Sequence, residues 1–272
     1  MSASPTPGTL YTALFDDAAI FPPGNVPMAE AIRAHLESLE SPAAPYIGPF
    51  VCSDARLAEL RALLGDSAIG LALTTSADHY PAAVHTVLSD PRMTLRSVEI
   101  ATHDVLVPVA ELPESATVYL ELPWGAQPDL PLGTALKLRT GGDTSDAFPT
   151  EDQLAHALGY CVGQNIAFKL TAGLHNAIRH TDPVTGFEHH GFLNVILAVL
   201  AALGEAHDGD LAEILANRDT GEIADAISAM GGVDIDRVRH YFRSFGTCRT
   251  SEPINDLYEL GLLKALPTRD AL

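Results

Sequence analysis

Residues 167–175 read Ala-Phe-Lys-Leu-Thr-Ala-Gly-Leu-His, and the organisation of the chain can be worked out from this stretch. Residues 166–170 are predicted to form a short buried strand, which the Thr171-Ala172-Gly173 turn ends. Lys169 interrupts the apolar run. Because a buried lysine costs free energy unless it has a charged partner or a chemical role, the stretch predicts a strand that carries a functional group.

A second lysine has matching surroundings. The chain contains only three lysines, Lys137, Lys169 and Lys264. Residues 136–142 read Leu-Lys-Leu-Arg-Thr-Gly-Gly, which is again an apolar strand with a central lysine and a glycine turn at its end. A chain with so few lysines that places two of them inside predicted strands is expected to use both.

Strand and helix patterns alternate along the chain. Short apolar strands are predicted at 10–15, 46–52, 68–73, 94–100, 117–122, 135–139, 166–170 and 245–248. Helices are predicted at 27–39, 55–64, 79–88, 150–163, 191–203, 210–217, 220–230, 234–242 and 254–266. This alternation is typical of an α/β protein with a parallel sheet covered by helices. Eight strands favour a (β/α)8 TIM-like barrel with extra helices after strand seven; the alternative is a doubly wound open parallel sheet. Residues 1–8 are expected to be a disordered tail, and residues 9–272 a single barrel domain.

Composition limits the partners of the protein. The 272 residues carry a formal net charge of −19, which repels nucleic-acid phosphates and anionic lipids, so neither nucleic acid nor membrane is expected to bind. The most apolar run, 192–203, is too short to cross a bilayer. Three distant cysteines without CxxC spacing, and no signal-peptide pattern, predict a cytoplasmic protein without disulfides. The expected partners are a small-molecule substrate and, as the default for such enzymes, a second copy in a homodimer.

The barrel prediction locates a site, because active sites of such barrels lie at the carboxyl ends of the strands. Glu99 and Glu121 lie inside the fourth and fifth predicted strands. They are expected to face the two strand lysines across the barrel mouth and to neutralise them. His175 directly follows the turn after the seventh strand. The residues predicted to be catalytic are Lys169, Lys137, Glu99, Glu121 and His175.

Substrate binding is predicted at the ends of three strands. The turn at residues 139–142 contains an arginine and two glycines, which suits a carboxylate or phosphate. Residues 243 and 244 would add a second anion contact, with an ordinary strand carrying a surface arginine as the alternative. Two carboxylates at 16 and 17 would bind a substrate hydroxyl or a metal, or would cap a helix. The residues predicted to bind substrate are Arg139, Thr140, Gly141, Gly142, Thr171, Asp16, Asp17, Arg243 and Ser244.

These groups permit Schiff-base chemistry. Lys137 or Arg139 would place a second cation beside Lys169. That cation would lower the pKa of the Lys169 ammonium and so supply a neutral amine nucleophile. Residues 137–142 and 169–173 resemble the two lysine strands of class I aldolases of the deoxyribose-phosphate aldolase type, in reversed order along the chain. The resemblance implies a lyase that forms a Schiff base on Lys169 with a small anionic carbonyl compound and requires no cofactor.

Two other functions remain open. Residues 176–190 form a long loop predicted to be a lid, and four histidines in or beside it would bind Zn²⁺, Mn²⁺ or Fe²⁺ in a metal-dependent hydrolase or isomerase. These histidines are His175, His180, His189 and His190. The third function is a non-catalytic barrel that binds a metabolite. The chain also resembles a family of uncharacterised bacterial proteins. The similarity covers most of the chain and includes residues 168–175, 190–194 and 242–248.

Overall fold

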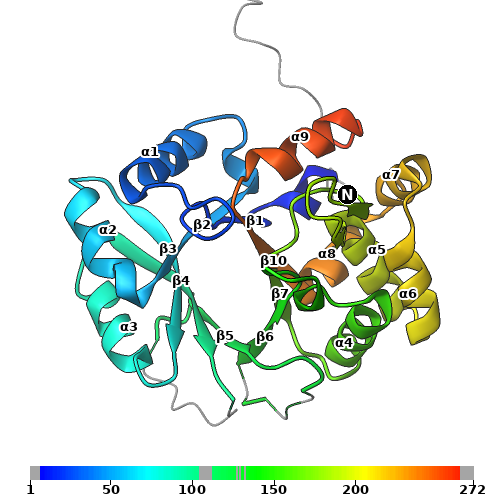
Figure 1. Cartoon of the computed structure of the whole chain (residues 1–272), viewed down its shortest axis with the longest axis horizontal. Helices are drawn as coiled ribbons and strands as arrows, with labels where there is room; N and C mark the ends of the chain where they lie inside the picture. The colour runs from blue at the N-terminus through cyan, green and yellow to red at the C-terminus, as the bar shows by residue number, and fades with distance from the viewer. Residues whose placement is uncertain (1–6, 104–111, 127, 129, 132, 264–272) are drawn as a thin grey trace, which may run out of the picture.

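The computed structural model describes residues 7–103, 112–126, 128, 130–131 and 133–263, and its centre is a closed barrel of eight strands (Figure 1). Around the barrel the order is β1-β10-β7-β6-β5-β4-β3-β2, and every neighbouring pair is parallel. The (β/α)8 TIM-like prediction is therefore confirmed, and the open-sheet alternative is wrong. The barrel strands are Phe15–Asp17 (β1), Ile47–Ser53 (β2), Ile69–Ser76 (β3), Met93–Ala101 (β4), Thr117–Glu121 (β5), Thr134–Arg139 (β6), Phe168–Thr171 (β7) and Phe242–Thr247 (β10).

Helices surround the barrel, and their distribution is uneven. In Figure 1, α1 to α3 lie beside β2 to β4, whereas α4 to α8 gather on the opposite side beside β7 and β10. The four helices α5 to α8 separate β7 from β10 in sequence, which confirms the extra helices predicted after strand seven. The helices are Met28–Leu39 (α1), Leu57–Leu63 (α2), Tyr80–Leu88 (α3), Glu151–Gly163 (α4), Phe192–Leu203 (α5), Asp208–Ala216 (α6), Thr220–Ser228 (α7), Gly232–Tyr241 (α8) and Ser251–Glu259 (α9).

Short elements complete the described chain. A two-stranded antiparallel hairpin, His180–Thr181 (β8) and Glu188–His189 (β9), interrupts the long loop after β7. Single 3-10 turns occupy Pro7–Tyr11, Ala44–Tyr46, Asp54–Arg56 and Ser145–Ala147. Residues 1–6 of the predicted tail and 264–266 of the last predicted helix lie outside the described residues, as does Lys264.

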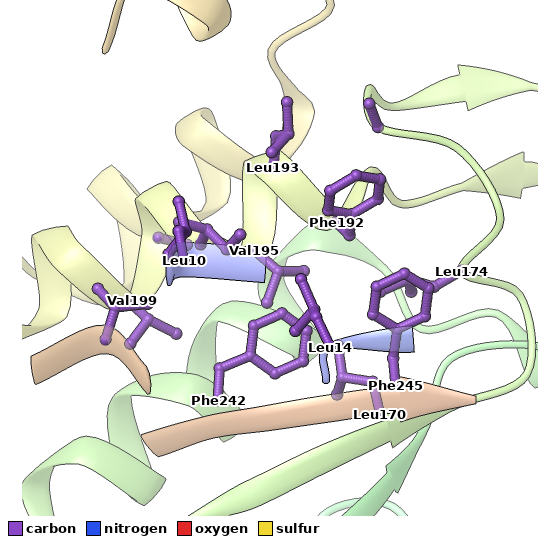
Figure 2. Close-up of a cluster of buried hydrophobic side chains, with 14 of the residues drawn as sticks. Leu10, Leu14, Leu170, Leu174, Phe192, Leu193, Val195, Val199, Phe242 and Phe245 are labelled. Atoms are coloured by element: carbon purple, nitrogen blue, oxygen red, sulfur yellow. The ribbon is translucent and has the colours of Figure 1, made fainter. Parts of the chain in front are cut away.

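The apolar helix α5 packs against the strands that close the barrel. Phe192 of α5 is fully buried and makes edge-to-face contact with Phe15 of β1, at 5.7 Å between ring centroids, and stacks on Phe245 of β10 at 5.4 Å. Figure 2 shows Phe242, Phe245 and Val195 of this cluster directed toward one another. Burying one such aromatic side chain contributes about 1.5–3 kcal/mol. The cluster thus joins the first strand to the last. Within the described part of the chain, no helix combines the length and apolar character needed to span a membrane.

Strands β1 and β10 begin at residues other than those predicted, and this changes the direction of four predicted site residues. Strand β1 begins at Phe15, because residues Pro7–Tyr11 form a 3-10 helix and Ala13 has a positive φ of 45°. Strand β10 begins at Phe242, immediately after α8. Consequently the acidic pair at 16 and 17 and the Arg-Ser pair at 243 and 244 lie within strands, so neighbouring side chains point to opposite faces.

Candidate active site

A cavity of about 1130 Å³ lies at the carboxyl ends of the barrel strands. Strand side chains form its floor, and the connections after β1, β2, β3, β7 and β10 contribute to its wall. Asp182, Val184 and Phe187 of the β8–β9 hairpin line its mouth. Since barrel enzymes place their chemistry at this end, the cavity is the candidate active site.

Alternating acidic and basic side chains form a continuous charge network at the floor. Lys169 donates to Asp16 and to Glu99, each at 2.5 Å between nitrogen and oxygen. Lys137 pairs with the second oxygen of Glu99 and with Glu121, each at 2.9 Å. The expected pairing of the strand lysines with the two glutamates is present. In order of contact, the charge network consists of Asp16, Lys169, Glu99, Lys137, Glu121 and Arg139.

The carboxylates fix the protonation of this network. Burial alone would lower the pKa of Lys169, but Asp16 and Glu99 outweigh burial and raise it well above its ordinary value. Burial alone would raise the pKa of Glu99, whereas Lys137 and Lys169 lower it to about 2. The expectation of a lowered Lys169 pKa is therefore wrong. The nearest charges to its ammonium are two carboxylates rather than a second cation, so Lys169 is cationic at neutral pH.

Asp16 supports the network from beneath. It is 2% exposed, and burial raises its pKa above the usual carboxyl value. Its Oδ2 accepts from Lys169 and, at 2.7 Å, from the hydroxyl of Ser244, while Oδ1 has no hydrogen-bond partner. Neither Asp16 nor Ser244 lines the cavity. In the structure Asp16 holds the ammonium of Lys169 and Ser244 holds Asp16, and contact of either with a substrate stays a prediction.

Two other predicted substrate contacts lie away from the cavity. Asp17 accepts from His35 of α1 at 3.0 Å and from the backbone of Ala19, because it points to the face of β1 opposite to Asp16. The side chain of Arg243 is exposed and does not line the cavity. The structure thus does not bring Asp17 and Arg243 together with the other predicted site residues.

The turn after β6 is built for close packing. Thr140 is fully buried, and its hydroxyl donates to the carbonyl of Ala172 at 2.5 Å. A Cβ atom on Gly141 would lie 2.7 Å from Cα of Gly173, so the two turns touch through their glycines. Thr140 and Gly141 are thus structural rather than lining residues. Arg139, Gly142 and Thr171 do line the cavity, and Arg139 is held by Glu121 at 2.9 Å.

His175 belongs to a cluster that includes residues the sequence interpretation missed. Its Nδ1 lies 3.1 Å from Oε2 of Glu252, 3.2 Å from the hydroxyl of Thr247 and 3.8 Å from the sulfur of Cys248. Burial alone would lower the pKa of His175, but Cys248 and Glu252 raise it to about 9. The position of Cys248 directly after β10 was the available signal, whereas Glu252 comes from α9.

A second polar cluster lies on the wall formed by β2 and β3. Oδ2 of Asp54 accepts from the hydroxyl of Thr75 at 2.8 Å and lies 3.1 Å from Nδ1 of His79. All three residues line the cavity. Asp54 and Thr75 lie at the carboxyl ends of predicted strands, and they add polar groups to the cavity wall.

The loop histidines are not grouped as a metal site. His190 is buried, and its two ring nitrogens contact Arg179 at 3.0 Å and the carbonyl of Pro149 at 2.8 Å. Nδ1 of His189 contacts the carbonyl of Gly173 at 3.0 Å. The rings of His180 and His189 lie 5.2 Å apart in the hairpin. Across the described residues, no group of three or more His, Cys, Asp or Glu side chains is arranged to hold a metal ion.

The site as a whole therefore combines cationic donors with a large cavity. Each lysine ammonium has three N–H donors, and among the described residues two of them go to carboxylates. The ammonium of Lys169 also lies 5.5 Å from the ring centroid of Tyr119. His175 adds an imidazolium on the wall. Such donors stabilise negative charge that develops on oxygen during a reaction. Comparison with known proteins gave no match to a family model, a curated protein or a solved structure.

Proposed function

We propose that the protein is a lyase that cleaves a carbon–carbon bond beside the carbonyl group of a small anionic compound. The observation that carries the proposal is the charge network, in which acidic and basic side chains alternate beneath the cavity. Bond cleavage beside a carbonyl leaves an enolate. The remaining N–H donors of Lys137 and Lys169 are suited to its oxygen, and Arg139 at the cavity wall is suited to the anionic group of the substrate.

The protonation of Lys169 favours electrostatic catalysis over Schiff-base formation. A Schiff base requires a neutral amine, and two carboxylates keep this amine protonated. In the proposed role, Lys169 stays an ammonium that stabilises the enolate. His175, whose pKa is raised to about 9 by Cys248 and Glu252 against the effect of burial, can return a proton to the product.

The test is cleavage in D₂O, followed by proton NMR. The panel contains 3-oxo acids such as oxaloacetate and 4-hydroxy-2-oxo acids such as 4-hydroxy-2-oxoglutarate. The wild-type protein is expected to cleave at least one class and to leave deuterium on the carbon where the bond broke. Lys169→Met is expected to lower kcat at least about 100-fold, the usual effect of removing one oxyanion donor.

The matched control is Arg33→Met, which removes a cation from an exposed ion pair with Glu37 on α1. It should leave the rate unchanged. Undiminished cleavage by Lys169→Met would contradict the role given to this lysine. A reduced adduct on Lys169 after borohydride treatment would instead establish the Schiff-base mechanism. Binding of panel compounds without any cleavage would identify a metabolite-binding barrel.

A further inference from the structure

The cavity wall contains a nucleophile that the proposed lysine chemistry does not use. Cys248 follows β10 directly, and its side chain lines the cavity together with those of His175 and Glu252. Cys248 lies in the bend after β10, whereas Ser244 within β10 is directed at Asp16 of the charge network.

The surroundings of Cys248 are those of an activated thiol. Its sulfur lies 3.8 Å from Nδ1 of His175, and Oε2 of Glu252 lies 3.1 Å from the same nitrogen. Glu252 is itself held by Arg249, at 3.1 Å between Oε1 and the guanidinium. The carboxylate, the hydroxyl of Thr247 and the sulfur all approach the same ring nitrogen, Nδ1. His175 therefore lies beside the thiol as a cation held by Glu252, and a neighbouring cation favours a reactive cysteine.

The other two cysteines of the chain provide an internal contrast. Cys52 and Cys161 are fully buried, and burial raises the pKa of each thiol to about 12. Cys161 lies in α4 and Cys52 in β2, and neither lines the cavity. Cys248 alone among the three has an imidazole and a carboxylate within reach in the same cavity.

We propose that Cys248 captures an aldehyde in the cavity as a thiohemiacetal, with His175 as the proton carrier and Glu252 as the residue that positions His175. The class of substrate rests on the proposed function, because cleavage of a 4-hydroxy-2-oxo acid releases an aldehyde. The thiol proton leaves to solvent, a sulfur–carbon bond forms, and the carbonyl π bond breaks. The protonated His175 gives its Nδ1 proton to the oxygen and regains a proton from solvent. Every atom is accounted for without an oxidant, and the step is reversible.

The experiment measures alkylation of the full-length protein by iodoacetamide, with peptide mass spectrometry to quantify each cysteine. Cys248 is expected to react at least about 10-fold faster than N-acetylcysteine at the same pH, because the imidazole of His175 lies 3.8 Å from its sulfur and stabilises negative charge there. Cys52 and Cys161 should remain unmodified. Glyoxylate, a small anionic aldehyde, should slow alkylation of Cys248 in proportion to its concentration.

Two variants separate activation from mere accessibility. His175→Gln is expected to lower the alkylation rate of Cys248 at least about 10-fold, and the milder Glu252→Gln about 3-fold. A rate no faster than that of N-acetylcysteine and equal in both variants would overturn the proposal. Alkylation that depends on His175 but is not slowed by glyoxylate would overturn aldehyde capture. None of these measurements requires carbon–carbon cleavage. Their results therefore test Cys248 independently of the cleavage assay with Lys169→Met.

Discussion

At the scale of a single residue, His175 couples the site to pH. Burial opposes its protonation, but Cys248 and Glu252 raise its pKa to about 9, whereas an unfolded histidine has a pKa of about 6.5. The folded protein therefore binds this proton more tightly than the unfolded chain does. The resulting stability is fully present below about pH 6.5 and is lost as pH rises through about 9.

We expect the free energy of unfolding to fall by about 1–3 kcal/mol between pH 6.5 and 9.5 because of this residue. Urea unfolding at a series of pH values measures the change. His175→Gln removes the titrating group and should flatten the curve by the same amount. An identical pH dependence in the variant would show that His175 is not protonated in the folded protein.

At the scale of an element, the β8–β9 hairpin is the predicted lid. Its base is fixed by Arg218, which donates to Glu188 and, at 3.1 Å, to the hydroxyl of Thr181. Its tip lines the cavity mouth, and Val184 there is 90% exposed. These contacts restrict any lid movement to the tip, while the base stays attached to the body of the protein.

Limited proteolysis with thermolysin tests this view at the bond between Gly186 and Phe187. Arg218→Ala should raise the cleavage rate about 5-fold, because the base of the hairpin opens more often. Arg237→Ala is the control, since this exposed arginine bonds only the carbonyl of Leu203 on α5 among its described contacts. A compound from the cleavage panel that binds in the cavity should slow proteolysis if the tip covers it. Equal cleavage of Arg218→Ala and wild type would show that these contacts do not hold the hairpin.

At the scale of the whole molecule, the charge network connects strands β1, β4, β5, β6 and β7. It is balanced, with three carboxylates and three cations. Lys169→Met leaves Asp16 and Glu99 short of one cation inside the barrel, and breaking a buried pair in this way costs about 3–5 kcal/mol. Adding Asp16→Asn restores the balance of two carboxylates to two cations.

We therefore expect the double variant Asp16→Asn/Lys169→Met to unfold at a higher urea concentration than Lys169→Met alone, with about 1–3 kcal/mol recovered. Arg33→Met breaks an exposed ion pair and should change stability by less than about 0.5 kcal/mol. Strictly additive losses from Asp16→Asn and Lys169→Met would show that the two side chains do not depend on each other.

The sequence predicts the barrel and the partners of its lysines because both follow from local patterns. Alternating strands and helices give the topology, and a charge inside an apolar strand requires an opposite charge nearby. The face chosen by Asp16 and Asp17 depends on where β1 begins, which the unforeseen 3-10 helix decides. The pairing of His175 with Glu252 joins residues 77 positions apart through α9, and no local pattern contains that contact.

The contact between Gly141 and Gly173 has a consequence for how this site can change over evolution. Gly173 has a φ of +77°, and a Cβ atom there would lie 2.4 Å from the carbonyl oxygen of Thr140. The two turns that follow the lysine strands consequently pack main chain against main chain. A larger residue at either glycine would push the two turns apart, so an exchange at one position favours a compensating exchange at the other.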